Sequence, residues 1–74
     1  MSKTIPALTA FIGVDKDGDE IGVIERDDDP RLPMIAEAGH PESAQILVHI
    51  RAQAEAVALR TGHEIREVRF VREP

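Results

Sequence analysis

The chain has 74 residues, a formal net charge of −5 and no cysteine. A chain this short buries only about 60% of the surface that its unfolded form exposes, so its core is small. Without cysteine, neither a disulfide framework nor a thiolate metal site can reinforce that core. We therefore expect one small domain over residues 1–74, for which a homodimer is one way of burying more surface.

The charge is divided unevenly along the chain. Residues 1–42 hold four basic and ten acidic side chains, whereas residues 43–74 hold five arginines and four glutamates. Binding to the phosphate backbone of a nucleic acid requires cationic charge. The acidic balance therefore argues against a general nucleic-acid binder.

The sequence carries no mark of a membrane or secreted protein. Residues 1–11 contain no long apolar run, and no segment approaches the roughly 20 apolar residues of a membrane helix. The lack of cysteine agrees with a reducing compartment. We expect a cytoplasmic protein with no membrane partner.

Residues 1–6 are expected to form a loose N-terminal segment, and residues 7–25 a β-hairpin. Two β-branched runs, ALTAFIGV and IGVIE, flank the dipeptide Asp17-Gly18. Glycine allows the positive φ that a tight hairpin turn needs. A two-residue loop at this dipeptide would place Val14 opposite Ile21.

This register divides the apolar residues of the hairpin between two faces. One face consists of Ile12, Val14, Ile21 and Val23. We expect this face to contact the helix described below, and Phe11 and Ile24 to lie on the other face. Gly13 and Gly22 would leave a bare area on that second face.

Residues 26–40 are predicted to form an acidic, proline-containing loop. Three consecutive aspartates, Asp27, Asp28 and Asp29, precede two prolines. Residues 33–36 could form a short additional strand, which the sequence leaves open.

The segment 41–61 is the one most clearly patterned as a helix. Its apolar residues recur at steps of three and four, which is typical of one buried helical stripe: Ile46, Leu47, Ile50, Ala54, Val57 and Ala58. Pro41 is suited to a first helical position, and Gly62 to the left-handed residue that ends a helix. Val48 and Leu59 lie outside the stripe.

Residues 64–72 are predicted to form the last strand, with Val68 and Phe70 on the face that meets the helix. The order is ββαβ, or βββαβ if residues 33–36 form a strand. We expect an α+β two-layer sandwich with one long helix on a three- or four-stranded, mainly antiparallel sheet. Because the helix is a crossover connection, the last strand should run parallel to the second and lie beside the first.

No motif for a cofactor, a metal or a catalytic nucleophile is present, so we expect a non-enzymatic protein without cofactors. The acidic turn after Asp15 resembles a calcium loop in composition, but Glu20 stands where such a loop requires glycine. The three histidines, at 40, 49 and 63, fall at the middle and at opposite ends of the predicted helix. They cannot converge on one ion within one chain.

Two groups of charged residues are the candidates for binding a partner. The first is the acidic run Asp27, Asp28 and Asp29, and the second is the set of arginines on the last strand, Arg66, Arg69 and Arg72. Arg69 would lie on the opposite strand face from the other two arginines, so the three do not form one patch. Charge on an exposed strand also protects an edge from aggregation.

Three hypotheses follow from these features. The first is a small interaction or accessory protein of bacterial or phage type with an unknown protein partner, in one form an acidic inhibitor of a basic target surface. The second is a nucleic-acid-binding protein that uses the arginines of the last strand. The third is a small enzyme or ligand binder whose site is formed at a dimer interface.

Overall fold

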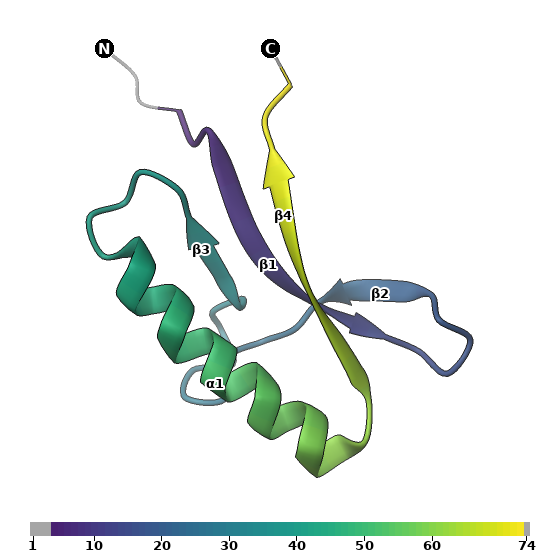
Figure 1. Ribbon diagram of the computed structural model, residues 1–74. Coiled ribbons are helices and arrows are strands. Elements are labelled where there is room, and N and C mark those ends of the chain that lie inside the picture. The colour runs from purple at the N-terminus through teal and green to yellow at the C-terminus, as the bar shows by residue number, and fades with distance from the viewer. Residues whose placement is uncertain (1–3, 74) are drawn as a thin grey trace.

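The computed structural model describes residues 4–73 and consists of one helix on one face of a four-stranded antiparallel sheet (Figure 1). The elements are, in chain order, β1 (Ala7–Val14), β2 (Glu20–Val23), β3 (Ile35–Glu37), α1 (Ser43–Thr61) and β4 (Glu64–Val71). The α+β fold predicted from the sequence is confirmed. The short strand left open for residues 33–36 is present as β3.

Strand β1 is the centre of the sheet. β4 pairs with it along its whole length, from Ala7 opposite Val71 to Val14 opposite Glu64. On the other edge of β1, β3 pairs with the first half of the strand and β2 with the second half. As predicted, β4 lies beside β1 and runs parallel to β2. Within the described chain, β1 is the only partner strand of β4.

The hairpin of β1 and β2 follows the predicted register except at its turn end. Two pairs match the prediction: Ile12 with Val23, and Gly13 with Gly22. Beyond them the register shifts, so that Val14 faces Glu20 instead of Ile21. This bulge turns Ile21 toward the helix side, where its Cγ1 lies 3.7 Å from the point that a Cβ on Gly13 would occupy.

The turn itself is built by Asp15. Its carboxylate accepts the backbone N–H groups of Asp17 and Asp19 at 2.9 and 3.0 Å. Gly18 adopts the expected positive φ, of 87°. The acidic run here therefore stabilises a tight turn through side-chain-to-backbone hydrogen bonds.

Helix α1 begins at Ser43, two residues later than predicted, and ends at Thr61 as predicted. Glu42 is the N-cap residue, while Gly62 has a φ of 72° and donates its N–H to the carbonyl of Ala58. Glycine tolerates this left-handed conformation without steric cost. No helix among residues 4–73 is long and apolar enough to cross a membrane.

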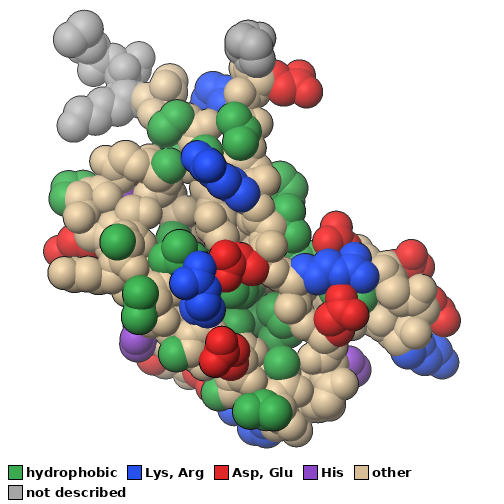
Figure 2. All heavy atoms as spheres, viewed as in Figure 1, with side chains coloured by type: hydrophobic (Ala, Val, Ile, Leu, Met, Phe, Trp, Pro, Cys, Tyr) green, Lys and Arg blue, Asp and Glu red, His purple; other side chains and the backbone are tan. Residues whose placement is uncertain are grey.

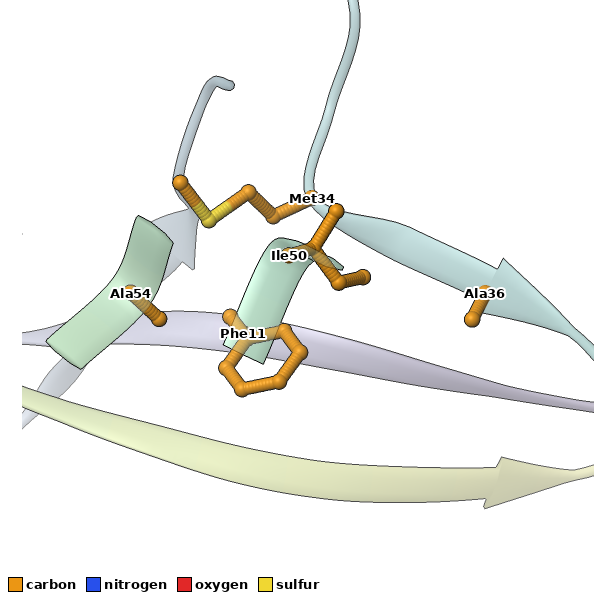
Figure 3. Packing of buried hydrophobic residues seen from close by; sticks show 5 residues of the cluster. All are labelled: Phe11, Met34, Ala36, Ile50 and Ala54. Carbon is orange, nitrogen blue, oxygen red and sulfur yellow. The ribbon is translucent and has the colours of Figure 1, made fainter. Parts of the chain in front are cut away.

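The core lies between α1 and the sheet (Figure 3). It consists of five buried residues from β1, the β3 region and α1: Phe11, Met34, Ala36, Ile50 and Ala54. Partly buried side chains surround them, and those from α1 are Ile46, Leu47 and Val57. The helical stripe predicted from the sequence is thus the surface that contacts the sheet.

The prediction of which sheet face meets the helix is wrong. Phe11 and Ile24 pack in the core, although we expected them on the outer face. The face predicted to contact the helix, which includes Ile12 and Val14 of β1, is the outer one. On β4, Ile65 packs against the core, whereas Phe70 is 49% exposed on the opposite face.

A glycine on the helix face of β1 makes room for the side chains that pack there. Gly13 lies on the helix face, and a Cβ at this position would be only 3.3 Å from Cγ2 of Ile24. The bare area therefore gives Ile24 room to pack beneath the helix. We predicted this bare area from the sequence but placed it on the face away from the helix.

Candidate interaction surface

The acidic loop is attached to the helix. The carboxylate of Asp27 accepts two hydrogen bonds from the guanidinium of Arg60, at 3.2 and 3.3 Å. The backbone N–H of Asp27 donates to Oε1 of Gln53 at 2.9 Å. These contacts hold the loop between β2 and β3 against one flank of α1, beside its buried stripe.

The two following aspartates also have partners within the chain. Asp28 accepts a hydrogen bond from Nε2 of Gln53 at 3.0 Å and lies 3.4 Å from Nε2 of His49. Asp29 accepts two hydrogen bonds from the guanidinium of Arg31. Hydrogen bonds from Gln53 and from Arg31 lower the pKa of Asp28 and of Asp29, respectively. All three carboxylates of the acidic run are therefore used in contacts that shape this loop.

The arginines of β4 are separated, as the strand alternation predicted. Arg66 lies on the outer face, 2.6 Å from Glu64 and 3.6 Å from Glu20. Its two carboxylate partners stand on either side of Val14 in the sheet, so the Arg66 side chain must cross over Val14. This network covers the turn end of the outer face, where Ile12 and Val14 are buried.

The other two arginines do not join Arg66. Arg69 lies opposite Thr9 on the helix face and has no ion pair among the described residues. Arg72 follows the end of β4 and donates its Nε–H to the carbonyl of Ile5 at 3.1 Å. Figure 2 shows acidic and basic side chains next to one another on the viewed face, not a broad area of one charge.

The rest of the outer sheet face is mainly apolar, with one charged residue, Glu37, opposite Leu8 on β3. We call the apolar part the open-face patch, and it consists of Leu8, Val23, Ile35, Val68 and Phe70. Cross-strand pairs place these residues on one face around Ala10, which is itself buried between its neighbours. Helix α1 covers only the opposite face, and no second layer lies on this one in the part of the chain described (Figure 1).

A shallow hollow of about 360 Å³ continues the patch at the end of the sheet where β1 starts and β4 finishes. It is lined mainly by apolar side chains, with one arginine: Ile5, Ala7, Leu8, Phe70, Val71 and Arg72. An apolar area rimmed by charge is typical of a protein-binding surface.

The described residues contain no group of three side chains able to hold a metal ion. His49 contacts the acidic loop, and Nδ1 of His40 accepts the backbone N–H of Glu42 at the start of the helix. These two histidines therefore have roles in local structure.

One ion pair connects the helix to the sheet on the covered side. The guanidinium of Arg51 donates to both carboxylate oxygens of Glu67, at 2.7 and 2.9 Å. These hydrogen bonds lower the pKa of Glu67 below the ordinary glutamate value of 4.5. Both side chains are more than a third exposed, so solvent screening keeps the contribution of this pair to stability small.

We expect Glu67→Gln to flatten the pH dependence of stability in acid. A carboxyl whose pKa is lowered by folding stabilises the protein above its unfolded-state pKa, and this contribution is lost as the pH falls through the folded-state value. Urea unfolding of dilute protein between pH ~6 and ~3 should therefore show a smaller loss of stability for Glu67→Gln than for the wild type. Arg51→Gln removes the partner that lowers the pKa of Glu67 and should flatten the pH dependence in the same way; a wild-type pH dependence in either variant would contradict the assignment.

The open-face patch is the feature that the sequence analysis missed. Val68 and Phe70 were expected to contact the helix, and the residues expected to bind a partner were all charged. The available signal was that both faces of the predicted strands carry apolar residues, while a single helix covers only one face of a sheet.

Comparisons with protein-family models, with curated proteins and with solved structures find no match.

Proposed function

We propose that the chain is a small, non-catalytic protein-binding module, and that the open-face patch is its binding surface. One observation carries this proposal: in the described residues a single helix covers one face of the sheet, which leaves the mainly apolar opposite face without cover. Val23 and Phe70 are the most exposed members of the patch. Burial of such side chains is the main favourable term in protein association.

The charged residues support a binding role over a catalytic one. Three carboxyls have a lowered pKa and an exposed hydrogen-bonded partner. Asp28 links the loop to the helix, Glu67 links the sheet to the helix, and Asp29 pairs within the loop. A general base or nucleophile is usually placed in a cleft that shifts its pKa toward its reaction. Here the lowered pKa values have a structural explanation.

The two specific alternatives receive less support. An acidic inhibitor would present Asp27, Asp28 and Asp29 to its target, but the three carboxylates are engaged within the chain. A nucleic-acid binder would need its arginines in one stripe, but Arg66 is paired with two glutamates. The partner that fits best is a cytoplasmic protein with an apolar surface and a carboxylate near Arg72.

Site-specific photocrosslinking in cells of the source organism tests this proposal. Phe70→benzoylphenylalanine places the reactive group on the open-face patch, and Leu59→benzoylphenylalanine places it on the exposed side of α1. Both native side chains are exposed, so both substitutions should leave the fold intact. We expect protein adducts from position 70 and several-fold fewer from position 59.

The mass of the adducts decides between partners. Adducts with another protein from position 70 support the proposal. Adducts mainly from position 59, equal yields from both positions, or adducts with nucleic acid alone would contradict it. Adducts at twice the chain mass report a second copy of this chain.

A further inference from the structure

Strand β4 forms an open edge of the sheet. It is eight residues long, and the described chain provides no strand on its outer side. An open edge presents a row of unpaired backbone N–H and C=O groups that can pair with another strand. The chemistry of this edge therefore depends on which residues direct those groups outward.

The hydrogen bonds identify these residues. The N–H of Arg72 donates to the carbonyl of Pro6 at 2.9 Å, so the even-numbered residues of β4 direct their backbone groups toward β1. β1 agrees with this alternation, because its odd-numbered residue Phe11 bonds away from β4, to Ile24 and Met34. Four residues of β4 consequently direct their backbone groups outward: Ile65, Glu67, Arg69 and Val71.

We propose that this edge pairs antiparallel with the β4 edge of a second copy, with the two-fold axis at Val68. In this register, Glu67 of each copy lies directly opposite Arg69 of the other. Both are outward residues, so their backbone groups bond across the axis. Arg69 has no ion pair in the described single chain, and each Glu67 oxygen has a second lone pair beyond its bond to Arg51.

The remaining pairs of this register are also compatible. On the helix face, Ile65 faces Val71, which joins two apolar residues across the interface. On the outer face, Val68 meets Val68 of the second copy and Arg66 faces Phe70, a cation over an aromatic ring. Glu64 faces Arg72 beyond the end of the strand. Cross-strand pairs of opposite charge and of apolar residues are both stabilising, whereas like charges directly opposite are destabilising.

The neighbouring registers are unfavourable. A shifted register keeps the same strand faces together only if it again pairs odd-numbered residues with odd-numbered ones. The two nearest registers of this kind change the sum of the two paired residue numbers by two. One such shift places Glu67 opposite Glu67, and the shift in the other direction places Arg69 opposite Arg69. The charges on this edge thus select one self-complementary register, which is a more specific property than protection against aggregation.

Pairing at this edge goes beyond the proposed function and does not depend on it. It would extend the sheet across the axis and bring the two open-face patches side by side, since Val68 belongs to both the patch and the axis. A separate protein partner would then meet an apolar surface contributed by two chains, which is joined at Val68 and flanked there by Arg66 of each chain.

Charge exchange at positions 67 and 69 tests the proposal. We expect the wild type to show a mass of twice 8.2 kDa in sedimentation equilibrium at sufficient concentration. Arg69→Glu and Glu67→Arg should each weaken self-association about tenfold or more, because each places like charges opposite at two symmetric positions. An equimolar mixture of the two variants should restore the dimer. In the mixed dimer, residue 67 of each chain again faces a residue 69 of opposite charge.

Matched controls separate the edge from general charge effects. Lys16→Glu and Glu55→Arg make the same changes in net charge elsewhere, and we expect both to dimerise like the wild type. Circular dichroism checks the fold, and if Glu67→Arg does not fold, the comparison of Arg69→Glu with Lys16→Glu decides. A monomeric wild type at hundreds of micromolar, or a dimer that Arg69→Glu leaves intact, would overturn the proposal.

These outcomes are distinct from those of the proposed function. Loss of the dimer in Phe70→Ser combined with an unaffected Arg69→Glu would indicate face-to-face association through the open-face patch, and would overturn the edge register. Crosslinks to another protein from position 70 of a monomeric chain would overturn the edge proposal and leave the proposed function standing.

Discussion

Phe11→Ala is expected to destabilise the protein by about 3–5 kcal/mol, whereas Phe70→Ala should cost at most about 1 kcal/mol. The chain has two aromatic residues, both on strands and on opposite faces of the sheet. Phe11 is 3% exposed beneath α1, so its removal leaves a cavity in the core. Phe70 is half-exposed, and its removal deletes only a partly buried surface.

Urea unfolding at low protein concentration measures both values without a contribution from self-association. If Phe11→Ala leaves too little folded protein, Phe11→Leu provides a milder variant that should still be less stable than Phe70→Leu. A larger loss for the Phe70 variants would mean that the helix covers the other sheet face.

Ile50→Ala should cost about 3 kcal/mol, within the range of 2–5 kcal/mol found for large-to-small changes in cores. Ile50 is fully buried at the middle of the α1 stripe, between the helix and the sheet. Val48→Ala is the matched control on the same helix, because Val48 is 66% exposed. We expect the control to change the free energy of unfolding by less than about 0.5 kcal/mol.

The two helix variants can be compared by thermal or urea unfolding. Equal destabilisation by Ile50→Ala and Val48→Ala would contradict the orientation of the helix. A loss of stability in Val48→Ala but not in Ile50→Ala would indicate a second contact surface on the exposed side of α1.

The helix and the order of strands could be predicted because the signals are local. Ile46, Ile50 and Ala54 recur at helical spacing, and Gly62 supplies the left-handed residue that ends the helix. Asp17-Gly18 marks the hairpin turn in the same way. The position of β4 beside β1 then follows from the rules of chain connection.

The face that meets the helix could not be predicted because both strand faces are apolar. Alternation assigns Phe11 and Ile12 to opposite faces of β1, but it does not say which of them the helix covers. In the fold, Gly13 lies on the helix face and leaves room there for Ile24. This contact is tertiary, so the spacing of residues along one strand does not reveal it.

The candidate residues named from the sequence were charged, whereas the proposed surface is mainly apolar. Asp27 and Arg60 are 33 residues apart in sequence and meet only in the folded chain. Only the fold shows that such acids are paired internally. The pairing of β4 edges could have been anticipated in part, because Glu67 and Arg69 lie symmetrically about Val68 in the sequence.

Amide hydrogen exchange along β4, followed by NMR at two protein concentrations, tests most directly that this strand is the open, interacting side of the sheet. We expect the amides of residues 66, 68, 70 and 72, which bond to β1, to be protected from exchange at both concentrations. We expect the amides of residues 65, 67, 69 and 71, which point away from β1, to exchange rapidly in the dilute monomer and to become protected as the dimer forms. Unprotected odd-numbered amides in a chain that is demonstrably dimeric would contradict this expectation, as would their protection in the dilute monomer.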